Sequence, residues 1–512
     1  MREVRKQIRA YESAWARLQH DEPGFVQTNE DAAFERALIG WLRFHRATLI
    51  GEVIPLLYSY LHSNPAAPER TNYSHILVDE YQDLNRAEQR VIDLLADAAD
   101  VCVIGDDDQS IYSFKFAHPE GIREWLDANA GADDLTLAEC RRCPTRVVEM
   151  ANNLIRNNVA RPVPRRLQPR PGNGVGDVRI LHYREIGAEI VGIATIVQNI
   201  IRAGTPPGEV LVLAQRGVIG TPIYEELMRR GVPAHSYYAE AELDKEEAQR
   251  RFAMLKLFVN RDDRVALRWL LGLGSSSWLS GGYARLRAFC EESVSTPWDA
   301  LEAILDRRVS IPHTAPLLRR FAEIRTEILG LEQAGNLAAV VEALFPDGHA
   351  GVRDLRARAL EALETVEPDD RGGFLSELTT LIATPEVPSE VAEVRIMSLH
   401  KSKGLSAAVT VIAGCVEGLL PKQPDSALPQ VLQNAQLEEQ RRLFYVGITR
   451  VKAEPEIGRP GTLVLSYSAE MPMAQAMGAG IAPAGRRYGT ARLLASRFIR
   501  ELGPSAPQPV AG

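Results

Sequence analysis

The stretch HILVDEYQD, residues 75–83, is the part of this sequence that decides the fold class. His75 to Val78 form a short, mostly apolar run of the length typical of a buried strand. Two adjacent acids, Asp79 and Glu80, follow it at once. A strand that ends in this way places its acids at the carboxyl edge of a sheet, where ligands bind in open α/β folds.

A strand followed by two acids is also the Walker B arrangement. There, one carboxylate holds Mg²⁺, usually through water, and the next one positions or deprotonates the water that attacks a γ-phosphate. We assign Asp79 to the metal and Glu80 to the water. The alternative is a strand that simply ends in a solvated acidic turn, and the pattern by itself leaves both interpretations open.

A second stretch, VCVIGDDDQSIYSF at residues 101–114, repeats the pattern of an apolar strand followed by polar residues. Gln109 lies where it could sense the γ-phosphate or the attacking water, and Phe114 could stack on an unpaired base. Taken alone, the stretch favours the plainer alternative, a Gly-Asp turn with an aromatic residue that returns to the core.

Similar apolar runs recur along the chain, with helical patterns between many of them. Continuous rather than alternating apolar runs indicate strands buried on both faces of a largely parallel sheet, so we expect an α/β fold. The expected strands are His75–Val78, Val101–Ile104, Val178–Leu181, Val210–Ala214, Val394–Met397, Val409–Ile412 and Leu463–Leu465; the helical patterns include Ala87–Ala98, Thr145–Asn157, Ile186–Arg202 and Tyr224–Arg230.

The run pattern stops between about residues 275 and 387, where apolar residues recur three and four positions apart. This spacing predicts a helical domain inserted into the α/β scheme. The first 60 or so residues are also mostly helical in pattern and precede the first expected strand.

Composition narrows the class of protein. The chain has 512 residues, which at roughly 150 residues per domain suggests about three domains. It carries 59 Lys and Arg against 67 Asp and Glu, a net charge of −8, with 45% hydrophobic residues. These values predict a folded protein and exclude one that coats nucleic acid by bulk charge, although a local basic groove remains compatible with them.

Cysteines and hydropathy point to a cytoplasmic protein. The five cysteines are odd in number and lack a framework spacing, as in reduced intracellular proteins. No apolar run approaches the length of about 20 residues that a membrane span needs, and the charged N-terminus lacks the apolar stretch of a signal peptide.

Three later stretches complete an ordered set. AECRRCPTRVVEMANNLI (138–155), VRIMSLHKSKGLSAAVTVIAGCVEGLLP (394–421) and EEQRRLFYVGITRVK (438–452) follow the two strand-end stretches. Together the five resemble motifs II to VI of superfamily 1 DNA helicases of the UvrD/Rep/PcrA type. The resemblance runs from about residue 35 to ASRFIREL near the end, and five motifs in order are highly specific.

The resemblance implies roles for single residues. Arg142 of motif IV would contact the γ-phosphate, and Arg450 of motif VI would be the arginine finger, a group worth on the order of 10³ to 10⁵ in rate in phosphoryl-transfer enzymes. The implied ATP- and Mg²⁺-binding residues are Asp79, Glu80, Gln109, Arg141, Arg142, Gly404 and Arg450, and the implied DNA-contacting residues are Phe114, Lys115, Ser398, His400 and Lys403.

The same resemblance implies RecA-like domains of the P-loop NTPase superfamily, the first incomplete and the second complete, with a helical insert. The expected boundaries are 1–60 (helical remnant of subdomains 1B and 1A), 61–130 (partial 1A), 131–275 (2A, first part), 276–388 (helical 2B insert), 389–502 (2A, second part) and 503–512 (flexible tail).

Several positions depart from the family pattern, and the largest departure is a missing P-loop. No G-x-x-x-x-G-K-[ST] occurs, and only 78 residues precede Asp79. The P-loop supplies the amides and the Lys that bind the β-phosphate. The chain therefore resembles a helicase without its amino-terminal portion, as expected for a truncated product, a mis-called start, or half of a split enzyme whose partner chain carries the Walker A segment.

The smaller departures lie within the motifs. Arg141 stands where a Tyr that stacks on adenine is usual, and a guanidinium can also stack. Ser406 replaces a ribose-contacting Glu. Phe114 and Lys115 replace the commoner Trp and Arg, and they keep the aromatic and cationic characters.

Two further features have open or plain interpretations. Cys140 and Cys143 form a single C-x-x-C without a second pair at zinc-ligand spacing, which favours a structural role over metal or redox use. Five arginines between residues 150 and 176, with no acid among them, suit a phosphate-contacting edge and a solvated linker equally well: Arg156, Arg161, Arg165, Arg166 and Arg170.

The expected function is an ATP- and Mg²⁺-dependent DNA translocase that acts in repair or recombination on single-stranded and duplex-junction DNA. The family implies 3′ to 5′ movement. The alternative, which follows from the missing P-loop, is a non-catalytic DNA-binding or regulatory subunit, or a gene remnant that cannot hydrolyse ATP alone. No nuclease constellation follows motif VI, so we expect no cleavage activity.

Overall fold

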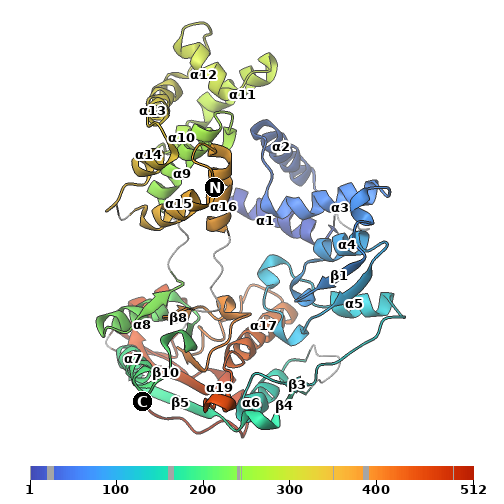
Figure 1. Ribbon diagram of the computed structural model, residues 1–512, viewed down its shortest axis with the longest axis vertical. Coiled ribbons are helices and arrows are strands. Elements are labelled where there is room, and N and C mark those ends of the chain that lie inside the picture. Colours follow the sequence, from blue (N-terminus) through green and yellow to red (C-terminus); the bar gives the residue numbers. More distant parts are fainter. Residues whose placement is uncertain are drawn as a thin grey trace. The chain divides into compact units, whose positions relative to one another are not determined.

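The computed structural model (Figure 1) describes residues 2–19, 28–159, 166–238, 243, 245–349, 351–383, 391–481, 483–487 and 489–512. The chain divides into two compact units. One, here called the α/β unit, comprises Met1–Glu22, Ile54–Ala239 and Val387–Gly512. The other, here called the helical unit, comprises Pro23–Val53 and Glu240–Glu386.

A large and mainly parallel sheet forms the centre of the α/β unit. Within the described residues it has nine strands, of which β13, β5, β10, β9, β6, β8 and β7 lie side by side in this order, all parallel. The hairpin β11–β12 joins the far end of β10 antiparallel. The bounds are β5 Asp177–Glu185, β6 Val210–Ala214, β7 Ala234–Ser236, β8 Val394–Met397, β9 Val409–Ala413, β10 Thr462–Pro472, β11 Gly485–Arg487, β12 Thr490–Arg492 and β13 Val510–Ala511.

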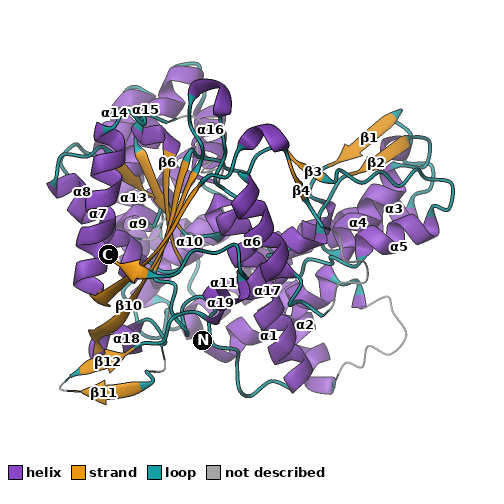
Figure 2. Ribbon diagram, turned by 90° about the horizontal axis from the view of Figure 1, so that it is seen from below, coloured by secondary structure: helices purple, strands orange, loops and turns teal. Residues whose placement is uncertain are grey.

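Helices cover both faces of this sheet (Figure 2). Strand β6 shows why its sequence is a continuous apolar run: Leu211 and Leu213 join the core on one face, and Val210, Val212 and Ala214 join the core on the other. The expected α/β class and parallel sheet are confirmed. The first core packs against α6 (Thr145–Ile155), α17 (Gln430–Ile448) and α19 (Arg497–Glu501), and the second against α7 (Ile186–Arg202), α8 (Gly217–Arg229) and α18 (Met473–Gly478).

A second, smaller sheet carries the two strand-end stretches. β1 (His75–Val78) pairs in parallel with β2 (Asp100–Val103), so that Val78 lies opposite Val103. A short pair, β3 (Glu139–Cys140) and β4 (Gln168–Pro169), is separate. The helices here are α1 (Arg2–Ala16), α3 (Val53–Ser63), α4 (Arg86–Leu95) and α5 (Gly121–Ala128).

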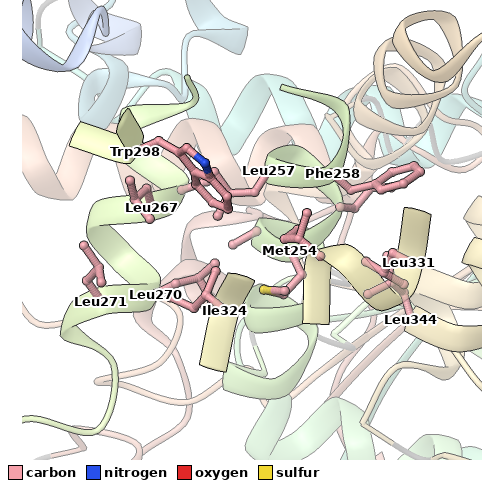
Figure 3. Close-up of a cluster of buried hydrophobic side chains, with 14 of the residues drawn as sticks. Met254, Leu257, Phe258, Leu267, Leu270, Leu271, Trp298, Ile324, Leu331 and Leu344 are labelled. Carbon is pink, nitrogen blue, oxygen red and sulfur yellow. The ribbon is translucent and has the colours of Figure 1, made fainter. Parts of the chain in front are cut away.

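The helical unit is built around one apolar core, in which side chains from several helices point toward one another (Figure 3). The rings of Trp298 and Phe321, for example, meet edge to face at 4.9 Å. Its helices are α2 (Asn29–His45), α9 (Glu246–Val259), α10 (Arg264–Gly272), α11 (Ser280–Ser293), α12 (Pro297–Leu305), α13 (Ala315–Glu332), α14 (Leu337–Leu344), α15 (Arg353–Thr365) and α16 (Arg371–Ala383).

The helical unit differs from the expected insert at 276–388. It begins at 240, because α9 and α10 pack into its core, and it takes in α2 from the first 60 residues. Phe44 of α2 lies in that core, and its carbonyl accepts a hydrogen bond from Arg264. The sequence could not show this, since the apolar spacing of a helix does not reveal which unit its face packs against.

None of the helices in the described ranges is long and apolar enough to cross a membrane.

Candidate functional site

The two acids of the first stretch lie directly after β1, at the carboxyl edge of the small sheet. Asp79 is exposed, and its Oδ1 accepts a hydrogen bond from the Glu80 amide at 2.8 Å. Glu80 adopts a left-handed conformation, with φ of 51°. A non-glycine residue with positive φ is uncommon and is found preferentially at functional sites. The turn then continues into the short helix η4 (Tyr81–Asp83).

A buried glutamine links the two strand-end stretches. Gln82 is 0% exposed; its Nε2 donates to Glu80 Oε2 at 2.5 Å, and its Oε1 accepts from the Asp106 amide at 2.9 Å. A Cβ on Gly105 would lie 2.5 Å from Gln82 Oε1, so a larger residue there would displace the Gln82 side chain. The sequence analysis assigned Gln82 no role. Its only sequence signal was a polar residue two positions after Glu80.

Lys403 joins three motifs at one point. Its ammonium lies 2.5 Å from Asp83 Oδ2 and 3.3 Å from Glu80 Oε2, and it donates to the Gln109 carbonyl at 2.9 Å. Its side chain is 6% exposed. Sequence reasoning placed Lys403 among the DNA contacts, whereas the structure places it on the acids of motif II.

Asp83 is a site residue that sequence reasoning missed. Burial raises the pKa of its carboxyl, and the hydrogen bond and charge of Lys403 oppose that rise. The second oxygen of this carboxylate, Oδ1, is buried and has no hydrogen-bond partner among the described residues. The Lys403 ammonium is therefore what compensates the buried Asp83 charge.

Gln109 ends the short helix η5 (Asp107–Gln109), at the carboxyl edge of β2. Its side-chain Nε2 donates to Asp106 Oδ2 at 2.8 Å, while its carbonyl accepts from Lys403. The structure thus brings the Glu80 carboxylate and the Gln109 backbone together through Lys403, while the Gln109 side chain binds Asp106.

Helix α17 holds the loop that follows η5. The Glu439 carboxylate accepts hydrogen bonds from the Ser113 amide at 2.9 Å and from its hydroxyl at 2.6 Å. Arg442 Nε donates to the Ser110 carbonyl at 2.8 Å, and burial lowers the pKa of Arg442. Both residues lie in the motif VI stretch, and sequence reasoning gave neither a role.

The loop presents an aromatic surface. Phe114, in η6 (Ser113–Lys115), is 49% exposed, and its ring meets that of His400 edge to face at 5.8 Å. Tyr112 packs beside Phe114, with the Lys115 ammonium 4.8 Å from the Tyr112 ring centre. Burial lowers the pKa of His400, which favours its neutral form. Phe114, Lys115 and His400, all predicted to contact DNA, thus lie together.

The two predicted phosphate-contacting arginines are neighbours with different exposure. Arg142 is exposed, and its Nη1 donates to the Thr449 carbonyl at 3.4 Å. Arg450 is only 2% exposed and donates to the carbonyls of Val446 at 2.8 Å and Leu405 at 3.2 Å. Burial, aided by the charge of Arg142, lowers the pKa of Arg450 to about 10. In this conformation the Arg450 guanidinium is bound to backbone, not presented to solvent.

The remaining predicted residues lie around this centre. Arg141 is exposed, with its Nε 3.8 Å from a Glu139 oxygen. Gly404 has φ of 84°, a conformation that favours glycine. Ser398 Oγ accepts a weak hydrogen bond from the Lys401 amide at 3.4 Å.

The residues present fit a Mg²⁺ ion bound together with a phosphate ligand. The described ranges contain no cluster of three or more side chains that could hold a metal alone. Mg²⁺ in nucleotide enzymes, however, is usually held by one or two carboxylates, by phosphate oxygens and by water. The exposed carboxylate of Asp79 matches that requirement.

The large parallel sheet covered by helices on both faces, together with the acids that follow β1 of the small parallel sheet, defines the class: the fold is that of the RecA-like P-loop NTPases. Two protein-family models match in order, the UvrD/REP helicase N-terminal domain over residues 19–128 and the UvrD-like helicase C-terminal domain over residues 359–457. Over these two ranges the chain is similar to the UvrD/Rep/PcrA-like superfamily 1 helicases.

Curated relatives agree with this family. DNA helicase II of Haemophilus influenzae is 28% identical over 488 residues, which cover 89% of this chain and 62% of the relative. DNA helicase II of Escherichia coli is 27% identical, covering 74% and 55%, and ATP-dependent DNA helicase UvrD1 of Mycobacterium leprae is 25% identical, covering 80% and 58%. The chain thus spans between 55% and 62% of the length of these relatives.

Proposed function

We propose that this chain provides the hydrolytic and DNA-contacting residues of an ATP- and Mg²⁺-dependent DNA translocase. It would work in the cytoplasm on single-stranded DNA and duplex junctions, move 3′ to 5′, and serve DNA repair or recombination. The family and the relatives' names support the helicase class. The direction of movement and the repair role are extensions from that class.

The junction at Lys403 is the observation that carries the proposal. The buried Lys403 ammonium, which belongs to motif V, contacts Glu80 and Asp83 of motif II and the Gln109 carbonyl of motif III. Three residues earlier in motif V, the His400 ring packs against Phe114. The acids are therefore joined to the exposed Phe114 ring through two residues, Lys403 and Tyr112, with the Lys403 ammonium 5.3 Å from the Tyr112 ring centre. Such a link is what a motor needs, because hydrolysis must be coupled to the contact with DNA.

The proposed roles follow from position. Asp79 would hold Mg²⁺, which neutralises phosphate charge when it is bound, and Glu80 would orient the attacking water. Gln109 and Arg142 would contact the γ-phosphate, and Arg141 and Gly404 would lie against the rest of the nucleotide. Phe114, Lys115, Ser398 and His400 would contact the DNA strand. For Arg450 to contact the γ-phosphate, its guanidinium would have to leave the carbonyls that it binds in this structure. For Lys403 to contact DNA, its ammonium would have to leave Asp83.

The test of this proposal is ATP hydrolysis by the purified 512-residue chain with Mg²⁺, with and without single-stranded DNA. Glu80→Gln keeps the size of the side chain and removes the carboxylate that orients water. We expect it to abolish nearly all DNA-stimulated hydrolysis while nucleotide binding remains. Glu225→Gln, an exposed carboxylate on α8, is the matched control and should keep full activity. A Glu80→Gln variant with most of its activity would refute the assignment.

A second candidate is a non-catalytic DNA-binding or regulatory subunit. Two observations favour it: the 512 residues contain no G-x-x-x-x-G-K-[ST], and the Arg450 guanidinium is bound to backbone carbonyls. A separate chain carrying the Walker A segment would restore hydrolysis to such a subunit. If the chain only binds DNA, the logarithm of its affinity for single strands should fall linearly with the logarithm of the salt concentration. The slope should be about −0.7 for each phosphate contacted. An affinity that changes with an ATP analogue would contradict this candidate.

A further inference from the structure

The backbone around Arg450 is paired with the backbone of motif V. The Ala407 amide donates to the Arg450 carbonyl at 3.0 Å, and the Lys452 amide donates to the Ala407 carbonyl at 2.9 Å. The Arg450 guanidinium donates to the Leu405 carbonyl at 3.2 Å. The position of this arginine therefore depends on how the motif V backbone that follows Gly404 is held against the end of motif VI.

Glu209 binds both of these segments from outside the two motifs. It ends the short helix η8 (Pro207–Glu209), directly before β6. Its Oε2 accepts a hydrogen bond from the Ala408 amide at 3.1 Å, and its Oε1 accepts one from the Lys452 ammonium at 2.9 Å. Because one carboxylate contacts a motif V amide and a motif VI side chain, the two segments cannot separate without breaking one of these contacts.

Lys452 lies between two acids. Its ammonium is 3.0 Å from Glu454 Oε1 as well as 2.9 Å from Glu209 Oε1, and the other oxygen of Glu454 accepts from Arg459 at 3.2 Å. Burial would lower the pKa of Lys452, but its hydrogen bonds to Glu209 and Glu454 outweigh that effect and raise the pKa. Lys452 is therefore charged at neutral pH, and its pairing with Glu209 is ionic.

Arg395 holds the same two backbone segments from the sheet. It is 1% exposed, although it lies in the otherwise apolar strand β8, and its Nη2 donates to the carbonyls of Gly208 and Ser406, both at 3.1 Å. Gly208 precedes Glu209, and Ser406 belongs to motif V. A buried charge is costly unless it is hydrogen-bonded, so these two bonds fix η8 relative to the motif V backbone.

We propose that Glu209, together with Lys452 and Arg395, is a positioning residue that sets the place of the motif VI arginine. The Arg450 guanidinium itself binds neutral oxygens, and a phosphate forms stronger, charge-assisted hydrogen bonds than these. The guanidinium can therefore change partners while its backbone stays in place. The consequence for ATP hydrolysis rests on the proposed function, whereas the positioning of Arg450 does not.

The experiment measures modification of Arg450 by phenylglyoxal, together with hydrogen exchange of residues 405–408 and 450–453, on the full chain by peptide mass spectrometry. Glu209→Ala removes both contacts of the carboxylate. We expect Arg450 modification and local exchange to rise by about tenfold or more, since a hydrogen bond to a charged group is worth at least that factor. Glu209→Gln, whose oxygen can still accept from the Ala408 amide, should have an intermediate effect. Unchanged modification and exchange in Glu209→Ala would overturn the proposal.

The matched control is Glu417→Ala. The Glu417 carboxylate also binds a backbone amide and a cation, both of them on Arg497, and its exposed fraction of 23% is close to the 25% of Glu209. This variant should leave Arg450 unreactive, and an equal rise in it would overturn the proposal. Lys452→Met should increase the reactivity of Arg450, whereas Lys452→Arg keeps the cation and should restore protection.

Hydrolysis gives a separate readout, for the chain alone or together with a chain that carries the Walker A segment. Glu209→Ala should lower kcat and leave KM for ATP nearly unchanged, because an arginine finger acts on the transition state. A raised KM at unchanged kcat would contradict the positioning role. A wild-type chain without hydrolysis would count against the proposed function only, since modification and exchange at Arg450 need no ATP.

Discussion

At the scale of single residues, Lys403 is the group on which the candidate site depends most. Its ammonium is almost fully buried and faces two carboxylates, and removing one partner of such a group leaves the others with uncompensated charge. Removing one partner of a buried ion pair lowers the free energy of unfolding by about 3–5 kcal/mol. The intact pair, by contrast, adds little stability relative to well-packed apolar residues at the same positions.

Replacement of Lys403 by Met should lower the free energy of unfolding of the α/β unit by about 3 kcal/mol, because Asp83 and Glu80 lose their cation. Urea denaturation of the full chain, followed by a probe in the α/β unit, measures this loss. Adding Asp83→Asn should recover part of it, since the buried charge disappears with its partner.

The control for this change is Lys401→Met, in the short helix η9 (His400–Ser402) that ends just before Lys403. Lys401 is exposed and donates to the Tyr237 carbonyl at 2.7 Å, without a carboxylate partner in that contact. Its replacement should cost well under 1 kcal/mol. Equal losses for the two lysines would contradict the interpretation of Lys403 as the compensating charge.

Glu189 is a second buried group, located in the first turn of α7. Its Oε1 accepts from the Gly414 amide at 2.9 Å and the Ser466 hydroxyl at 2.7 Å. Burial raises the pKa of its carboxyl above the ordinary value of 4.5, although these hydrogen bonds oppose the rise. A carboxyl with a raised pKa in the folded state favours folding when protonated. That stabilisation is present below 4.5 and is lost as pH rises through the folded value.

The substitution Glu189→Gln should therefore stabilise the protein at pH 7 to 8, because the amide keeps an acceptor oxygen and carries no charge. The gain should shrink as the pH falls and vanish below about 4.5, where wild-type Glu189 is also neutral. Urea denaturation of the two proteins across pH 4 to 8, followed by a probe in the α/β unit, measures it. A variant that is less stable at every pH would show that the charged form is the favoured one.

At the scale of elements, α17 is the support of the loop that carries Phe114. Glu439 and Arg442 are three residues apart on this helix, so they lie on the same face. Glu439 binds Ser113, and Arg442 binds the Ser110 carbonyl. The loop contributes few apolar residues to the cores, so these polar contacts are what order it.

Replacement of Glu439 by Ala should increase hydrogen exchange in residues 110–116 several-fold, because Ser113 loses both of its bonds to the helix. Ser113→Ala, which keeps the amide bond and removes only the hydroxyl, should have a smaller effect. Gln440→Ala is the control on the same helix, since its side chain accepts from the Lys422 amide instead. Exchange that is unchanged in Glu439→Ala would mean that the loop is ordered by other contacts.

At the scale of the whole molecule, the chain has separate cores in its two units. Helices α9 to α16, together with α2, form the core of the helical unit. In the α/β unit, helices pack on both faces of the large sheet and form two further cores. Units with their own cores unfold with their own free energies, so a single melting temperature does not describe this chain.

A matched pair of cavity variants tests this independence. Phe321→Ala and Phe444→Ala each remove a fully buried ring, the first in the helical unit and the second in the α/β unit. Each should destabilise its own unit by about 3–5 kcal/mol. Hydrogen exchange should rise in α9 to α16 for the first variant and in β6, β9 and α17 for the second. If each variant loosened both units equally, the division into separate cores would be wrong.

The sequence predicted the strands better than the boundaries between units. The seven expected strands all appear, and five of them lie within one residue of their predicted bounds, because a short apolar run is a local signal. The other two, β5 and β10, end four and seven residues later than predicted. The helical unit begins at 240 instead of 276, because assigning α9 requires knowing which core Met254 and Leu257 enter. That information lies in the contacts between distant residues.

The sequence by itself determined the α/β class, the strand-end position of Asp79 and Glu80, and the similarity to UvrD-like helicases. Each of these follows from residue types at short, fixed spacings. Only the tertiary structure decided that Lys403 binds Asp83, 320 positions away, that Gln82 bridges Glu80 and Asp106, and that Arg450 is buried. The physical reason is that a side chain's charge partner and burial depend on which segments the fold brings together, and no local pattern contains that distance.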